Sequence, residues 1–257
     1  MIVVKNVGFS YAKQTVLKNI NVEFPSEKVT ALIGPNGAGK STLLNLVAQQ
    51  SELQAGKITL SGDDVSDLKP RERALRMAVV AQQIGVASRL RVRDLISFGR
   101  WPQHQGRPTV VDKKAVEIAI DEFELQDIAG RFLDEISGGQ RQRAFVAMAY
   151  AQDTPWLLLD EPLNNLDIRH ASLLMKQLRA LVSQKGKSIA MVIHDLNYAI
   201  SAADHIIALK DGQLAFAGDT RDVATSRSLS ELYDSKIEIV TAGEKTFAFH
   251  HHDLCGL

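Results

Sequence analysis

The sequence has only one cysteine in 257 residues, Cys255, so no disulfide can form within the chain. This usage is typical of proteins from a reducing compartment. Long hydrophobic runs are also missing. The apolar stretches at residues 144–151 and 156–159 fall well short of the roughly 18 residues that cross a bilayer, so we expect no membrane-spanning segment. The opening residues 1–10 lack the features of a secretory signal, and we expect no export.

The chain has no excess of either charge, because 30 basic residues balance 30 acidic ones. No overall field therefore attracts nucleic acid or anionic lipid. A hydrophobic content of 45% is enough to build a full core, which argues against disorder. These numbers favour one large α/β domain, or a core with a smaller inserted subdomain.

Two kinds of strand are predicted from the hydrophobic pattern. Residues 2–11 and 19–24 alternate apolar with polar side chains, which indicates half-buried antiparallel strands. Continuous apolar runs are typical of buried parallel strands with chemical groups at their carboxyl ends, and they occupy residues 28–34, 155–160 and 188–195. Residues 205–218 predict a hairpin whose turn is the sequence KDGQ.

Helical periodicity dominates residues 88–152 and predicts a helical subdomain inserted into the core sheet. Within it, residues 99–109 are rich in glycine and proline and predict an exposed loop. The final residues read as a frayed tail. Its adjacent histidines, His250–His252, could hold a metal, but neighbouring side chains at a terminus rarely converge on one ion.

Residues 34–41, GPNGAGKS, match the phosphate-loop pattern G-x-x-x-x-G-K-[ST] between a predicted strand and a predicted helix. Gly34, Gly37 and Gly39 allow the main chain to bend so that N–H groups face a β-phosphate. We expect Lys40 to contact the β- and γ-phosphate oxygens and the Ser41 hydroxyl to bind Mg²⁺. The alternative is a glycine-rich turn with no ligand.

Two acids follow the apolar run at residues 156–159. We expect Asp160 to hold the Mg²⁺ shell and Glu161 to orient and deprotonate a water molecule. An Asp-Glu pair is common at strand ends, so the indication comes from its combination with the phosphate loop. Together the two segments predict hydrolysis of a nucleoside triphosphate.

Three further residues fit this chemistry, each with a simpler alternative. Gln82 ends a predicted strand and could reach the Mg²⁺ or the attacking water, or could be an ordinary polar residue at a strand end. His194 could contact the γ-phosphate or be a satisfied buried histidine. Tyr11 could stack on the base or simply pack within its strand.

A second glycine-rich stretch, EISGGQRQR at residues 135–143, precedes a predicted helix. It offers N–H groups and a helix dipole but neither a lysine nor an acid. It can therefore bind a γ-phosphate only where another surface supplies the remaining contacts.

In this order the motifs resemble the ATP-binding subunits of ABC transporters, from about residue 2 to 240. The resemblance implies a P-loop NTPase core of the RecA type with a mainly parallel sheet and an N-terminal antiparallel β subdomain. It also implies a single ATPase domain over residues 1–240. The implied parts are a core at 1–87 and 153–240, a helical insertion at 88–152 and a tail at 241–257.

The family's functional residues map onto this sequence position by position. Catalytic roles fall on Glu161, His194 and Gln82, with Mg²⁺ held by Ser41, Gln82 and Asp160. ATP contacts are implied for Tyr11, Gly34, Pro35, Asn36, Gly37, Ala38, Gly39, Lys40, Ser41, Thr42, Ser137, Gly138, Gly139, Gln140 and Asp167. Ile136 replaces the usual leucine, which conserves volume. Asn164 and Asn165 replace commoner D-loop residues and leave that loop's contacts open.

The resemblance also implies partners. A second copy of the chain would complete each ATP site, a separate membrane permease would dock near residues 82–101, and an extracytoplasmic binding protein would deliver substrate. The chain would then lie at the cytoplasmic face of the inner membrane. The arginines of the docking region, Arg89, Arg91, Arg93 and Arg100, could instead form a nucleic-acid patch, but no interleaved aromatics accompany them, and we expect no nucleic-acid partner.

Within the family, residues 132–170 and 194–219 look like ATPases of importers for iron–siderophore complexes, haem and cobalamin. The stretch at 163–170 is most similar to the ferric catecholate branch. An ATPase of another ABC transporter is one alternative. A soluble ABC ATPase acting on ribosomes or DNA is another, but the chain lacks the second cassette or long coiled coil typical of that class.

Overall fold

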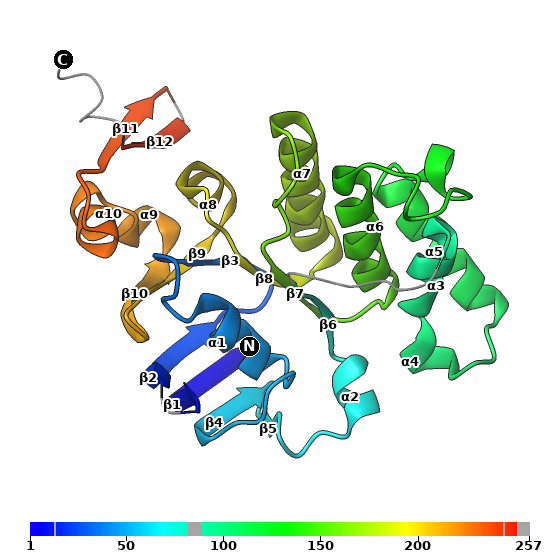
Figure 1. Cartoon of the computed structure of the whole chain (residues 1–257), viewed down its shortest axis with the longest axis horizontal. Helices are drawn as coiled ribbons and strands as arrows, with labels where there is room; N and C mark the ends of the chain where they lie inside the picture. The colour runs from blue at the N-terminus through cyan, green and yellow to red at the C-terminus, as the bar shows by residue number, and fades with distance from the viewer. Residues whose placement is uncertain (13, 82–88, 244, 251–257) are drawn as a thin grey trace. The chain divides into compact units, whose positions relative to one another are not determined.

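The computed structural model describes residues 1–12, 14–81, 89–243 and 245–250 (Figure 1). The chain divides into two compact units. The first unit consists of Met1–Asp67 and Ala190–Leu257, and the second unit is Leu68–Ile189.

The first unit contains an antiparallel sheet in the order β2-β1-β4-β5. Its strands are β1 (Ile2–Tyr11), β2 (Gln14–Phe24), β4 (Ala55–Leu60) and β5 (Asp63–Asp64). The apolar residues that alternate along β1, among them Ile2, Val4 and Val7, are buried. Ile2 pairs with both Phe24 and Leu60, so β1 has a neighbour on each side. This confirms the half-buried antiparallel strands predicted from the alternation.

Four further strands follow the order β10-β9-β3-β8, and β8 belongs to the first unit from Ala190 onward. β3 (Val29–Ile33) is buried along its whole length and runs parallel to β9 (His205–Lys210), as its continuous apolar sequence predicts. β9 returns as β10 (Gln213–Asp219) through the predicted turn. β8 (Ser188–Val192) ends beside β3, where the Ile193 N–H donates to the Leu32 carbonyl at 3.1 Å.

Helices and one hairpin complete the first unit. The helices are α1 (Lys40–Val47), α8 (Leu196–Ala202), α9 (Thr220–Val223) and α10 (Ser226–Tyr233). The hairpin consists of β11 (Glu238–Ala242) and β12 (Lys245–Phe249), in a part of the chain where the sequence predicted only a tail. It is tied to α8, because the Asn197 side chain accepts a hydrogen bond of 2.8 Å from the Ala248 N–H.

The second unit combines a parallel strand pair with helices. β6 (Met77–Val80) and β7 (Trp156–Asp160) pair in parallel. The helices are α2 (Pro70–Ala74), α3 (Val92–Phe98), α4 (Trp101–His104), α5 (Val110–Glu122), the 3-10 turn η1 (Gln126–Ile128), α6 (Gly138–Ala151) and α7 (Ile168–Lys185). α6 packs against both α3 and α5 (Figure 1). The described part of the predicted helical segment, residues 89–152, is thus mainly helical, as predicted.

The prediction of an exposed loop at residues 99–109 is wrong in one part. Trp101–His104 forms the short helix α4, in which Pro102 occupies an early position that tolerates proline. Arg100 before it is only 7% exposed, because its guanidinium pairs with the buried Asp112 carboxylate at 3.1 Å. The glycine and proline content indicated a loop, but this long-range ion pair fixes the segment.

Within the described part of the chain, no helix combines the length and the apolar character needed to traverse a membrane.

Candidate functional site

The phosphate loop of the first unit runs from the end of β3 to the start of α1. Gly34, Gly37 and Gly39 have φ angles of +139°, +80° and +98°, a region that glycine adopts without a steric penalty. A Cβ at Gly34 would lie 2.0 Å from the Leu209 carbonyl oxygen, so only glycine fits there. The loop ends at the N-terminus of α1, where main-chain N–H groups can receive an anion.

Lys40 is the first residue of α1 and is 5% exposed. Its ammonium group donates hydrogen bonds to the carbonyl oxygens of Gly34 at 2.7 Å and Pro35 at 2.8 Å. Ser41 and Thr42 follow on the first turn and are half-buried, whereas Asn36 in the loop is exposed. Lys40 therefore brings a positive charge to the glycine-rich turn that precedes its helix.

Tyr233 supports the same loop and was missed by the sequence analysis. Its hydroxyl accepts a hydrogen bond of 3.1 Å from the Gly34 N–H, and burial raises the pKa of Tyr233 to about 12. Tyr233 is the last residue of α10, almost 200 positions from Gly34, and no sequence motif marks it. The hydrogen bond fixes the point where the chain leaves β3.

His194 and Tyr11 also lie in the first unit. His194 is exposed, so the alternative of a buried histidine is wrong. It follows Ile193, whose bond to Leu32 places it at the same sheet edge as Gly34. Tyr11 ends β1, and 53% of its surface is exposed. Its ring and that of Phe9 pack edge to face, with 4.8 Å between the ring centroids.

The two acids lie in the second unit at the end of β7. Asp160 is 3% exposed, and Glu161 is half-buried. Glu161 has a φ angle of +53°, which is unusual for a residue with a side chain. The amide group of Asn164 donates a hydrogen bond to Glu161 Oε2, and the Asn164 N–H donates to the Glu161 carbonyl at 3.2 Å.

The second glycine-rich stretch forms the N-terminus of α6. Ser137 is the N-cap: its hydroxyl accepts from the Gln140 N–H at 3.2 Å, and the Ser137 N–H donates to the Gln140 side chain at 3.0 Å. This capping box fixes the start of a 14-residue helix. Ser137 and Gly138 are exposed, so this helix terminus can meet an anion from outside.

Asp167 caps α7 in the same unit. Its carboxylate accepts a hydrogen bond of 2.8 Å from the His170 N–H and contacts the His170 ring at 2.8 Å. These contacts hold the pKa of the Asp167 carboxyl below its usual value. Arg143 of α6, another residue that the sequence analysis missed, is 6% exposed and donates to the Phe123 carbonyl at 3.4 Å. The only available signal was its position directly before the apolar run that starts at Ala144.

The structure thus gathers the predicted residues in two groups. Pro35, Ala38 and the rest of the phosphate loop lie with His194 in the first unit, while the acids, the capping box with Gly139, and Asp167 lie in the second. Gln82 lies outside the described residues, as do 82–88 of the predicted docking region.

The four arginines proposed as an alternative nucleic-acid patch are engaged within the second unit. Arg89 pairs with Glu135 at 3.4 Å, and Arg93 pairs with Glu117. Arg91 donates to the Gly130 carbonyl at 2.5 Å, and Arg100 belongs to the buried pair described above. Three of these arginines therefore have an acidic partner, whereas Arg91 has a neutral carbonyl partner and keeps its charge.

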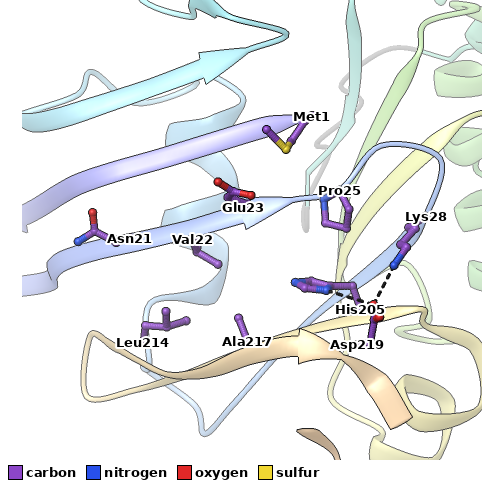
Figure 2. A pocket seen from close by; sticks show the side chains of 10 residues that line it. All are labelled: Met1, Asn21, Val22, Glu23, Pro25, Lys28, His205, Leu214, Ala217 and Asp219. Atoms are coloured by element: carbon purple, nitrogen blue, oxygen red, sulfur yellow. Dashed lines mark hydrogen bonds and ion pairs between the residues drawn. The ribbon is translucent and has the colours of Figure 1, made fainter. Parts of the chain in front are cut away.

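A groove in the first unit of about 430 Å³ lies away from the phosphate loop (Figure 2). Lys28, just before β3, pairs there with Asp219 at 2.8 Å, and His205 begins β9. The phosphate loop instead follows the opposite end of β3. The groove therefore shares no residue with the candidate site.

The described residues contain no cluster of three or more His, Cys, Asp or Glu side chains able to hold a metal ion. Mg²⁺ usually takes one or two protein oxygen ligands and completes its shell with phosphate oxygens and water. The Ser41 hydroxyl in the first unit and the Asp160 carboxylate in the second each offer an oxygen of that type.

Comparisons with known proteins agree with this geometry. A model of the ABC transporter family matches residues 17–164. The petrobactin import ATP-binding protein YclP of Bacillus subtilis (strain 168) is 42% identical over 241 residues, 94% of this chain and 96% of the relative. An inward-facing metal-chelate type ABC transporter has a TM-score of 0.83 and 26% identity, over 97% of this chain and 95% of that one. A dimeric bacterial ABC transporter cassette has a TM-score of 0.78 and 27% identity, and the match covers 86% of this chain and 99% of that cassette. These likenesses confirm the predicted P-loop NTPase fold.

Proposed function

The chain belongs to the ABC transporter family of ATP-binding proteins, and on that premise we propose that it powers uptake of a ferric siderophore through a separate membrane permease. The observation that carries this proposal is the identity of 42% to a petrobactin import ATP-binding protein along nearly the whole of both chains. The chain itself acts as an ATPase. ATP binding and hydrolysis supply the free energy, and the permease supplies the path.

ATP binding is assigned to the phosphate loop. The main-chain N–H groups of residues 36–42 would surround the β-phosphate, and Lys40 would exchange its carbonyl partners for phosphate oxygens. Tyr11 presents a half-exposed ring on whose face an adenine can stack.

Hydrolysis is assigned to Glu161 as the general base that accepts a proton from the attacking water. By likeness to the family, His194 and Gln82 would contact the γ-phosphate and that water. Mg²⁺, held by Ser41, Asp160 and Gln82, would neutralise charge on the phosphate oxygens. The position of Asp160 supports this assignment, because it ends the buried parallel strand β7, and ligands of such sheets bind at the carboxyl ends of the strands.

The capping box at Ser137 is assigned to the ATP held by a second copy of the chain. Ser137, Gly138, Gly139 and Gln140 offer an exposed helix terminus with no lysine, so their phosphate must come from outside. Asp167 belongs to the same surface. Two copies then enclose two ATP molecules head to tail.

The energetics of this closure are modest. Shifting a dimer from 1:99 to 99:1 closed takes about 5.5 kcal/mol of differential binding. Each ATP supplies about half, which corresponds to one or two charge-assisted hydrogen bonds of about 1.5 to 3 kcal/mol each. Hydrolysis removes the bridging phosphate, and the dimer opens.

The permease is assigned to the surface near residues 82–101. Phe98 and Trp101 support this, because they are 50% and 55% exposed in a region whose arginines are engaged. Exposed aromatic side chains are enriched at protein interfaces. An extracytoplasmic binding protein completes the system, and the chain works at the cytoplasmic face of the inner membrane. We assign residues 1–240 to one ATPase domain, with the helical insertion at 88–152.

Uptake of ⁵⁵Fe-petrobactin tests the proposal in a strain that lacks the chromosomal copy of this chain. The wild-type chain restores uptake, and Glu161→Gln, matched in size to the native residue, does not. Lys176→Ala, an exposed change on α7, serves as the control and restores uptake. Equal uptake with Glu161→Gln and with the wild type would rule the proposal out.

A further inference from the structure

Glu161 and Asn164 are joined by two hydrogen bonds across one tight turn of the second unit. The side-chain amide of Asn164 donates to Glu161 Oε2, and the Asn164 N–H donates to the Glu161 carbonyl oxygen at 3.2 Å. The first bond fixes the carboxylate, and the second closes the turn. One residue thus constrains both the side chain and the main chain of the acid.

The main chain at Glu161 requires such support. Its φ angle of +53° is sterically unfavourable for a residue with a Cβ, and the fixed ring of Pro162 follows directly. Sparsely populated main-chain conformations persist only where the surroundings hold them, and they concentrate at functional sites. Asn164 lacks this strain, since its φ angle is not positive. It can therefore act as the fixed end of the turn.

A carboxylate at the end of a glutamate side chain has three rotatable bonds and little intrinsic direction. A hydrogen bond to one oxygen selects one rotamer and thereby sets the direction of the other oxygen. A general base must lie within hydrogen-bond reach of the proton it accepts, so a fixed direction contributes to rate.

We propose that Asn164 is a positioning residue that holds the Glu161 carboxylate in the orientation needed to activate water. This inference rests on the proposed function, in which Glu161 is the general base. It also gives a role to a D-loop residue that departs from the commoner sequences.

The test measures ATP hydrolysis by the full chain with its permease. Asn164→Ala lowers kcat by between about tenfold and a hundredfold, because the base loses its orientation. KM for ATP stays within about twofold, because the phosphate loop is unchanged. Asn164→Gln, which keeps an amide donor on a longer stem, recovers part of the loss. An unchanged kcat in Asn164→Ala, or a loss that falls on KM, would overturn the proposal.

A charge-matched pair separates the specific contact from a general effect of added charge. Asn164→Asp replaces the donor with an acceptor against the Glu161 carboxylate and lowers kcat at least as much as Asn164→Ala. Gln184→Glu adds the same charge at an exposed position of α7 in the same unit. It retains most of the activity. Equal losses in the two variants would contradict the inference.

A double-mutant cycle shows whether Asn164 acts through Glu161. In a Glu161→Gln background, single-turnover hydrolysis of γ-³²P-ATP is slow, and adding Asn164→Ala slows it no further. Additive losses would refute a positioning role. The proposed function fails separately, because it falls if Glu161→Gln alone hydrolyses ATP and supports uptake normally.

Discussion

The ammonium group of Lys40 and the carbonyl oxygen of Gly34 are joined by a hydrogen bond of 2.7 Å that links the two ends of the phosphate loop. Lys40 opens α1, whereas Gly34 follows the buried strand β3. The bond therefore holds the positive charge of Lys40 against the loop, and the side chain is almost entirely buried. A loop ordered in this way loses little entropy when it receives phosphate oxygens.

Lys40→Ala weakens ATP binding by at least about tenfold, because a hydrogen bond to a charged group contributes about 1.5 to 3 kcal/mol. Isothermal titration of the purified chain with ATP and Mg²⁺ measures the change. Lys176→Ala removes an exposed lysine of α7 and leaves the affinity intact. If the two variants bind ATP equally well, Lys40 does not contact the phosphates.

Gly34→Ala destabilises the fold far more than Gly37→Ala does. The new Cβ at Gly34 would lie 2.0 Å from the Leu209 carbonyl oxygen, whereas the Cβ at Gly37 would meet nothing within 4 Å. We expect Gly34→Ala to lower the free energy of unfolding by more than about 3 kcal/mol and Gly37→Ala to lower it by about 1 kcal/mol. Urea denaturation followed by circular dichroism tests this, and equal losses would show that the close approach is not rigid.

Ser137→Arg lowers the rate of permease-coupled ATP hydrolysis at least about tenfold, because the larger side chain fills the space in front of the exposed start of α6. ATP binding by the phosphate loop remains. Ser137→Ala is the matched control: it removes the capping hydroxyl at a cost of about 1 kcal/mol in stability without adding bulk. Its hydrolysis falls less. Normal hydrolysis by Ser137→Arg would show that this helix terminus meets no nucleotide of a second copy.

The buried pair of Arg100 and Asp112 predicts acid sensitivity. Hydrogen bonds from Thr109, followed by Arg100, lower the pKa of Asp112 to about 2. A lowered folded-state pKa adds stability above the unfolded value of about 3.9, and this stability is lost as the pH falls towards 2. At pH 6, Asp112→Asn loses about 3 kcal/mol because Arg100 loses its buried partner.

Chemical denaturation at a series of pH values checks this prediction. The difference between wild type and Asp112→Asn shrinks from pH 4 towards pH 2. Glu117 lies on α5, as Asp112 does, and forms a half-exposed pair with Arg93 of α3. Glu117→Gln therefore costs less than about 1 kcal/mol in the free energy of unfolding at any pH. A difference that does not change with pH would place the stabilisation elsewhere.

Local patterns were enough to predict the elements that carry the chemistry. β3, the glycine turn and α1 were predicted because an apolar run, a fixed glycine spacing and a helical sequence adjoin each other. β7 with Asp160 and Glu161 was predicted for the same reason. In each case the signal lies within about a dozen consecutive residues, so no long-range information was required.

Contacts between distant residues could not be predicted in this way. Tyr233 reaches Gly34 from almost 200 residues away, and Arg100 reaches Asp112 across a segment that reads as a loop. The hydrogen bond from Asn164 to Glu161 is local, yet it depends on the positive φ angle of Glu161. Sequence patterns do not report such an angle for a residue other than glycine.

We expect that neither glycine-rich segment encloses ATP without a second copy of the chain. Light scattering of purified Glu161→Gln with ATP and Mg²⁺, together with a count of bound nucleotide, measures this dependence. We expect twice the mass of one chain, two ATP per pair, and a return to one chain when Ser137→Arg is added. A Glu161→Gln chain that binds ATP and remains a monomer would contradict it.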